Sequence, residues 1–295
     1  MPCVLLAFDD EAGFARSLAA QAGIELRSVA RHRFPDDELK LTLPARLPER
    51  TVLLRTLDHP NEKLVELLLA ARTARTLGAR QLTLVAPYLA YMRQDMAFAQ
   101  GETVSQTIVG RFLADLFDAV ITVDPHLHRT ATLAQAVPAR TAIALSAAPL
   151  IGRFIAAQGL RPLLIGPDGE SMQWVAEAAH AGGFEHAVGH KIRHGDRDVD
   201  IELPAVDLRG RHVVLVDDVA STGRTLARAA EAVRAAGAAR IDVAVTHALF
   251  VGDALAALAA AGVREVWSTD SIAHPTNRIA LAPMIAAALQ TVGVQ

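Results

Sequence analysis

Short apolar runs alternate along the chain with longer segments in which apolar residues recur at helical spacing. The runs predict strands and the longer segments predict helices. The predicted strands are Val52–Arg55, Leu82–Ala86, Val120–Val123, Leu163–Ile165, Val213–Val216 and Ile241–Val245. The predicted helices are Glu62–Leu77, Val104–Phe117, Ser171–Ala181 and Leu226–Ala236. The side chains predicted to be core in the first helix are Leu64, Leu67 and Leu68. Because the strands are almost entirely apolar, the alternation favours an α/β fold with mainly parallel sheets flanked by helices.

The alternation of strands and helices restarts after the stretch Pro138–Leu150. At 295 residues the chain is long enough to form two ordinary domains. We therefore interpret this stretch as a boundary between two α/β domains of similar size, over residues 1–145 and 146–295.

Composition excludes several classes of protein. The formal net charge of -3 gives no electrostatic basis for binding nucleic acid. Although 52% of the residues are hydrophobic, no apolar run approaches the length that spans a membrane. The opening MPCVLLAFDDEAG lacks a basic region and turns acidic at Asp9, so no signal peptide is expected. The single cysteine, Cys3, cannot form an internal disulfide, which fits a cytoplasmic protein.

Polar clusters follow several of the predicted strands. In open parallel sheets, ligands bind at the carboxyl ends of the strands, so these clusters are the candidate binding loops. They are Tyr88–Gly101, Asp124–Arg129, Gly166–Ser171 and Asp217–Thr225.

The stretch Val213–Thr225, VVLVDDVASTGRT, combines an apolar strand, two carboxylates and a loop of small hydroxyl residues. Hydroxyls, a glycine and a helix start together favour an anion site, although the chain contains no GxxxxGK[ST] nucleotide loop. Carboxylates repel phosphate, but they accept hydrogen bonds from sugar hydroxyls and hold Mg²⁺ through water. A sugar phosphate therefore suits the whole stretch. The alternative is a solvated acidic turn before a helix capped by Ser221 or Thr222.

This stretch resembles the phosphoribosyl-diphosphate (PRPP) motif shared by type I phosphoribosyltransferases and ribose-phosphate diphosphokinases. The resemblance implies that Asp217 and Asp218 contact ribose hydroxyls. The implied 5-phosphate site comprises Ser221, Thr222, Gly223, Arg224 and Thr225. Arg224 replaces the glycine usual in diphosphokinases, and either adds a cation to the phosphate or points to solvent.

Further stretches resemble the diphosphokinases, and they occur in the family's order. They are Arg33–Glu38 (RFPDDE, for RFxDGE), Pro87–Asp95 (PYLAYMRQD, for PYFGYxRQD), Ile121–His126 (ITVDPH, for TVDLH), Gly166–Gly169 (GPDG, for SPDxGG) and Lys191–Arg193 (KIR, for K-x-R). Together they cover nearly the whole chain, which resembles a ribose-phosphate diphosphokinase with catalytic-loop spacing closer to archaeal-type members. The resemblance implies two domains of the type I phosphoribosyltransferase kind.

The resemblance implies an ATP site in which Phe34 and Arg93 cover the two faces of adenine, one as an aromatic contact and one as a guanidinium stack. The residues implied at or near the adenine edge are Asp36, Glu38, Gln94 and Asp95. In the family the phenylalanine comes from a neighbouring subunit, so a homo-oligomer with a shared ATP site is expected. Asp37 replaces a family glycine and Met96 replaces a common basic residue.

The resemblance also implies that His126 and Asp168 bind Mg²⁺, one from each domain. Because Mg²⁺ prefers oxygen, water and phosphate should complete most of its shell. His128 and Arg129 replace smaller or amide residues of the common bacterial enzymes, and their roles stay open.

Lys191 and Arg193 are the implied catalytic residues, on a lid that closes over phosphates. The alternative is a solvated β-hairpin. Its second arm, in which Val199, Ile201 and Leu203 alternate with acids, is predicted to be a half-buried strand in either case.

The implied reaction converts MgATP and ribose 5-phosphate into PRPP and AMP, by attack of the 1-hydroxyl on the β-phosphorus. Such transfers depend on positioning and charge neutralisation, which agrees with the lack of an obvious Ser-His-Asp or Cys-His set. Two alternatives stay open, a phosphoribosyltransferase that consumes PRPP and a non-catalytic paralogue that regulates a synthetase. The retained residues that argue against the paralogue are His126, Asp168, Lys191 and Arg193.

Overall fold

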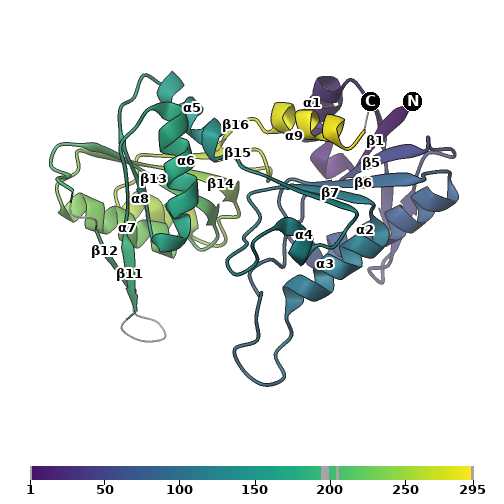
Figure 1. Cartoon of the computed structure of the whole chain (residues 1–295), viewed down its shortest axis with the longest axis horizontal. Coiled ribbons are helices and arrows are strands. Elements are labelled where there is room, and N and C mark those ends of the chain that lie inside the picture. Colours follow the sequence, from purple (N-terminus) through teal and green to yellow (C-terminus); the bar gives the residue numbers. More distant parts are fainter. Residues whose placement is uncertain (1, 194–198, 204–205, 294–295) are drawn as a thin grey trace. The chain divides into compact units, whose positions relative to one another are not determined.

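The computed structural model describes residues 2–193, 199–203 and 206–293, which form two compact units. The first unit runs to Leu145 and resumes at Leu281, and the second spans Ser146–Ala280. Each unit is built on a six-stranded sheet in which, among the described residues, every pairing is parallel (Figure 1). The predicted α/β class with helix-flanked parallel sheets is therefore confirmed.

The sheet of the first unit has the strand order β2-β1-β5-β6-β7-β8. Its strands are β1 (Cys3–Ala7), β2 (Glu25–Ser28), β5 (Arg50–Leu54), β6 (Gln81–Ala86), β7 (Ala119–Val123) and β8 (Thr141–Leu145). Its helices are η1 (Asp9–Glu11), α1 (Ala12–Ala22), α2 (Pro60–Thr76), α3 (Ser105–Leu116), α4 (Leu133–Ala136) and α9 (Ala282–Thr291). On one face, Leu53 and Leu84 of the strands pack in a common core with Leu67 of α2 and Leu113 of α3.

The sheet of the second unit has the strand order β10-β9-β13-β14-β15-β16. Its strands are β9 (Leu163–Gly166), β10 (His186–Val188), β13 (His212–Ala220), β14 (Arg240–Ala248), β15 (Glu265–Thr269) and β16 (Asn277–Ile279). Its helices are α5 (Ala148–Ala157), η2 (Gly169–Ser171), α6 (Met172–Gly182), α7 (Arg224–Ala235) and α8 (Ala254–Ala260). Successive β13 residues face opposite cores, Leu215 with α7 and α8 and Val214 with α5 and α6, as an apolar strand buried on both sides requires.

Two antiparallel hairpins stand apart from the main sheets. One joins β3 (Ala30–Arg33) to β4 (Leu39–Thr42), and the other joins β11 (His190–Arg193) to β12 (Val199–Glu202). Within the described ranges, no helix is both long and apolar enough to cross a membrane.

Helix α9 returns the end of the chain to the first unit, where it packs on α1 and against β7 and β8 (Figure 1). Its buried residues recur at helical spacing and form one apolar stripe. They include Ala282, Ile285, Ala286 and Leu289. The range 146–295 expected for the second domain thus contains a final helix that belongs to the first unit.

The structure corrects two details of the predicted elements. The strand predicted to end at Val216 continues to Ala220, because pairing with β14 extends from Asp217 opposite Val245 to Ala220 opposite Ala248. Leu67 is fully buried, but Leu68 is 38% exposed, so its assignment to the core is wrong. In α2, Leu68 turns away from the sheet that Leu67 covers.

A network of buried charges lies at the carboxyl edge of the first sheet. Arg55, which directly follows β5, is only 1% exposed. Its guanidinium contacts Glu66 at 2.5 Å, Asp10 at 2.8 Å and Glu11 at 3.1 Å. It also lies 4.5 Å from the centre of the Phe8 ring. Such a cation is tolerated in the interior only because carboxylates surround it.

The same network fastens the β3–β4 hairpin to α2. Arg31 of β3 contacts Glu66 at 2.6 Å, so Glu66 is shared between the hairpin and Arg55. Arg33, two residues along β3, pairs with Glu62, one turn earlier in α2. Residues two apart on a strand and four apart on a helix each share a face, so the two ion pairs lie side by side.

Burial raises the pKa of Glu11 from 4.5 to about 7, although Arg55 and the backbone N–H of Thr56 act in the opposite direction. The unfolded chain releases this proton near 4.5, whereas the folded chain keeps it until about 7. The contribution of Glu11 to stability is therefore complete below 4.5 and is lost as the pH rises through about 7.

We expect Glu11→Gln to remove this pH dependence. Relative to the variant, the wild-type chain should lose on the order of 3 kcal/mol of unfolding free energy as the pH rises through this interval. Urea unfolding followed by circular dichroism at a series of pH values measures the difference. Glu25→Gln is the matched control, because Glu25 is exposed and Arg27 lowers its pKa. If the difference in unfolding free energy between the wild-type chain and Glu11→Gln did not change with pH, the raised pKa of Glu11 would be contradicted.

Candidate functional site

Three carboxylates meet at the carboxyl edge of the second sheet. Asp217 and Asp218 lie within the last residues of β13, rather than in the loop after it as predicted. Asp168 follows β9, the strand paired in parallel with β13, and its side chain accepts a hydrogen bond from the backbone N–H of Glu170 at 3.1 Å. Desolvation, followed by the charges of Asp218 and Asp168, raises the pKa of Asp217 well above its ordinary value. The arrangement suits hydroxyl donors or a cation, because both relieve the repulsion among the three carboxylates.

The loop after these carboxylates leads directly into α7. Gly223 is the N-cap residue, with φ at 68°, and offers no side chain to the helix. The alternative in which Ser221 or Thr222 caps the helix is therefore not what the structure shows. Because no N-cap side chain hydrogen-bonds to the first turn of α7, its N–H groups remain available to an anion.

The position of the glycine is set by its surroundings as well as by its backbone. A Cβ at Gly223 would lie 3.2 Å from the Cβ of Ala254, in addition to the strain of the left-handed conformation. The loop is held by hydrogen bonds from Phe250 N–H to Ala220 O and from Val251 N–H to Ser221 O, both 2.9 Å. Helix α7 starts at Arg224, two residues before the predicted start, so Arg224 and Thr225 form its first turn.

The tip of the β3–β4 hairpin presents the residues expected at adenine. Phe34 is 40% exposed, lies edge-on to His32 with ring centres 4.8 Å apart, and has the Lys40 ammonium 5.9 Å from its ring centre. The exposed carboxylates of Asp36 and Glu38 stand on the same turn. An exposed aromatic ring at a tip fastened to α2 by ion pairs can stack on a flat ligand.

Asp37 stands where the resemblance implies a glycine. Its φ of 76° is the left-handed conformation that glycine adopts most easily. The turn is closed by hydrogen bonds from Phe34 N–H to Glu38 O at 2.8 Å and from Asp37 N–H to Phe34 O at 3.0 Å. Aspartate tolerates this conformation better than most residues, so it fits a backbone position that favours glycine.

The loop after β6 carries the other residues expected at ATP. Arg93 is exposed, and the Gln94 side-chain amide donates to the Met96 carbonyl at 2.9 Å. The Asp95 side chain is only 1% exposed and forms an ion pair with Arg129 at 2.9 Å. The structure therefore brings Asp95 to Arg129, whose role the sequence left open.

Gln106, in the first turn of α3, was not singled out by its sequence, yet it joins two of the loops. Its amide N–H donates to Met92 O at 3.1 Å, and its amide oxygen accepts from the Thr130 hydroxyl at 2.9 Å. Its backbone N–H donates to Gln94 O at 3.1 Å. Gln106, Gly110 and Leu113 follow one another at helical spacing and share the buried face of α3. A polar residue on that face was the signal in the sequence that could have identified Gln106.

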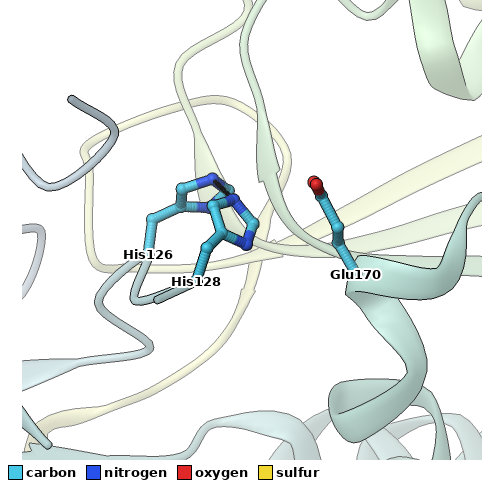
Figure 2. A group of neighbouring side chains, drawn as sticks. All are labelled: His126, His128 and Glu170. Atoms are coloured by element: carbon cyan, nitrogen blue, oxygen red, sulfur yellow. Dashed lines mark hydrogen bonds between the residues drawn. The ribbon is translucent and has the colours of Figure 1, made fainter. Parts of the chain in front are cut away.

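The loop after β7 carries two histidines. The rings of His126 and His128 face each other edge to face, with centres 3.8 Å apart, and their Nε2 atoms are hydrogen-bonded (Figure 2). Glu170, also drawn in Figure 2, is on η2 of the second unit. The expected pairing of His126 with Asp168 joins residues of different units and stays a prediction.

Lys191 and Arg193 lie on β11, opposite Ile201 and Val199 of β12. Their side chains are outside the part of the chain that the structure describes. The hairpin begins at the same edge as the three carboxylates, because Gly189 N–H donates to Gly166 O, at the end of β9, at 2.9 Å. The predicted strand in the second arm is β12 (Val199–Glu202).

Comparison with known proteins adds an end-to-end likeness. A model of the N-terminal domain of ribose phosphate pyrophosphokinase matches residues 3–119, and a model of the phosphoribosyl transferase domain matches residues 147–260. The ribose-phosphate pyrophosphokinase of Methanopyrus kandleri is 35% identical over 97% of this chain and 98% of its own length. That of Halobacterium salinarum is 33% identical over 97% of this chain and 100% of its own.

A solved structure agrees with the fold. The phosphoribosylpyrophosphate synthetase from Mycobacterium smegmatis superposes with a TM-score of 0.86, covering 99% of both chains, at 22% sequence identity.

The turn at Asp37 yields a test. We expect Asp37→Gly to leave the turn closed, whereas Asp37→Val should open it by about 1–2 kcal/mol, because β-branched residues resist the left-handed conformation. Hydrogen exchange at the Phe34 amide, which is bonded to Glu38 O, reports this opening. Roughly tenfold lower protection is expected in the valine variant alone. Equal loss in both variants would show that the Asp37 side chain, not its backbone conformation, holds the turn.

Proposed function

Because this chain belongs to the ribose-phosphate pyrophosphokinase family, we propose that it transfers the diphosphoryl group of MgATP to the 1-hydroxyl of ribose 5-phosphate. The products are PRPP and AMP. The observation that carries the proposal is the end-to-end match to relatives of that name, which includes a whole domain before the PRPP motif. A phosphoribosyltransferase needs only the second domain, so the first unit and its ATP-side motifs count against that alternative.

Ribose 5-phosphate is proposed to bind at the carboxyl edge of the second sheet. Asp217 and Asp218 accept hydrogen bonds from the ribose hydroxyls, which offset the desolvation and the carboxylate repulsion that raise the pKa of Asp217. The phosphate lies at the open N-terminus of α7, where N–H groups and the helix dipole favour an anion. The residues proposed to surround it are Ser221, Thr222, Gly223, Arg224 and Thr225.

ATP is proposed to bind through the first unit. Phe34 and Arg93 cover the adenine faces, and the other residues proposed at or near the ring are Asp36, Glu38, Gln94 and Asp95. The Asp95 carboxylate already holds Arg129, so its proposed contribution is to position the loop next to Arg93.

The transfer itself needs positioned charge more than a strong base. The 1-hydroxyl oxygen loses its proton to solvent and bonds to the β-phosphorus as the bond from that phosphorus to the α–β bridging oxygen breaks, and AMP leaves. Lys191 and Arg193 are proposed to neutralise charge on the transferring group. Mg²⁺ enters as part of MgATP, and the resemblance adds His126 and Asp168 as ligands. A carboxylate beside the acidic pair suits Mg²⁺, whereas a loop with two imidazoles suits it less well.

The direct test is to incubate the purified chain with ribose 5-phosphate and MgATP. We expect AMP and PRPP in equal amounts, measured by phosphorus NMR or chromatography. Consumption of added PRPP with a purine base, and no AMP from ATP, would indicate the phosphoribosyltransferase instead. Loss of neither substrate would favour the non-catalytic paralogue.

Two variants then separate the proposed roles. Lys191→Ala should lower kcat by about 10²–10³ with little change in either KM, because a contact made at the transition state alone behaves in that way. Asp218→Asn should raise the KM for ribose 5-phosphate and leave that for ATP unchanged. A raised KM in Lys191→Ala, or a lowered kcat with unchanged KM in Asp218→Asn, would contradict the role proposed for that residue.

We extend the proposal to a homo-oligomer in which Phe34 of one subunit and Arg93 of another hold the same adenine. Mixing equal amounts of inactive Phe34→Ala and Arg93→Ala proteins should restore about one quarter of the wild-type activity, the share of all sites that carry neither change after random exchange. No recovery after demonstrated subunit exchange would place both residues in one subunit.

A further inference from the structure

The loop after β7 holds two imidazole nitrogens that face one another, and its second histidine has no role in the proposed reaction. We propose that His126 and His128 together bind one divalent first-row transition ion, of the class of Mn²⁺, Co²⁺ or Ni²⁺. Its catalytic meaning rests on the proposed function, but binding of the ion is measurable without either substrate. With both histidines as ligands, this loop prefers a transition ion, whereas His126 alone would be a ligand of Mg²⁺.

The local sequence places both rings on one side of the loop. Leu127, between the histidines, is partly buried and packs against the core of the first unit. His126 is half-buried and His128 is exposed. With Leu127 turned inward, its neighbours project outward together, and the two rings meet through their Nε2 atoms (Figure 2). The His-Leu-His order is therefore a short chelating segment anchored at its centre.

The loop is also fixed on both sides of the histidines. Before them, the buried Asp124 donates its backbone N–H to Leu145 O at 2.8 Å. After them, the backbone N–H and the guanidinium of Arg129 both bond to Asp95, at 3.3 and 2.9 Å. Thr130 continues the attachment through Gln106. A loop that is already held loses little conformational freedom when it binds an ion, which favours affinity.

The surrounding charge permits a cation. Arg129 is the nearest cationic residue along the loop, and its charge is offset by Asp95, whose side chain is almost fully buried. The arrangement that competes with metal binding is a hydrogen bond between two neutral imidazoles, in which one Nε2 donates to the other. If the pair serves only as this hydrogen bond, Co²⁺ should bind there no more tightly than at single surface histidines, so metal titration separates the two arrangements.

The donor set selects the class of ion. Mg²⁺ demands oxygen ligands and releases its water reluctantly, so two imidazoles gain little from it. Imidazole binds first-row transition ions well, with affinity rising from Mn²⁺ through Co²⁺ to Ni²⁺. A second imidazole nitrogen in the donor set therefore shifts the preference of the site away from Mg²⁺.

The test is calorimetric titration of the full chain with Co²⁺, without ATP or ribose 5-phosphate. We expect one tight site per chain, which a large excess of Mg²⁺ does not empty. His126→Ala and His128→Ala should each weaken it on the order of tenfold or more. His180→Ala, an exposed histidine on α6, is the matched control and should bind as the wild-type chain does. Co²⁺ should also raise the melting temperature of the wild-type and control chains more than that of the two variants.

Unchanged Co²⁺ affinity in His128→Ala would overturn the proposal, as would displacement of Co²⁺ by an equal concentration of Mg²⁺. Leu127 and Arg129 hold the loop that carries the half-buried His126 and the exposed His128, and circular dichroism of each variant checks that the fold is kept. Because no substrate is present, absence of PRPP formation would leave this result untouched. Normal PRPP formation with no tight Co²⁺ site would contradict the proposed ion site of His126 and His128 and leave the proposed function standing.

Discussion

Parallel pairing of the strands is the constraint from which the rest of the structure follows. Because every strand in each main sheet runs the same way, all their carboxyl ends meet at one edge, and residues far apart in sequence become neighbours there. In the second unit, the pairing of β9 with β13 places Asp168 beside Asp217. In the first, the pairing of β6 with β7 places Asp95 beside Arg129.

Parallel sheets are buried on both faces, which explains how far the sequence alone could lead. The part of β13 from Val213 to Val216 shows as an unbroken apolar run, and the polar residues that follow such runs mark the functional edge. Edge strands and alanine-rich helices give weaker signals. Helix α9 reads as APMIAAALQT, and nothing local indicates that its stripe faces α1 rather than the second unit.

The polar contacts could not be read from patterns, because they depend on which loops the fold brings together. Arg55 looks like the exposed end of a strand, yet it is buried among carboxylates from η1 and α2. The left-handed backbone of Asp37 is invisible in its residue type. Leu68 has the helical spacing of a core residue but is exposed to solvent. Helix α2 carries more apolar residues than the stripe that faces the sheet can hold.

The return of α9 has a consequence for how the chain is made. A ribosome makes this helix only after the whole second unit, because α9 follows Ala280 in the chain. Until then the first unit lacks Ile285 and Leu289, and the face of its sheet that they help to cover stays open. The first unit therefore starts to be synthesised before the second but becomes complete only after it. The second unit can fold while the first unit still lacks helix α9.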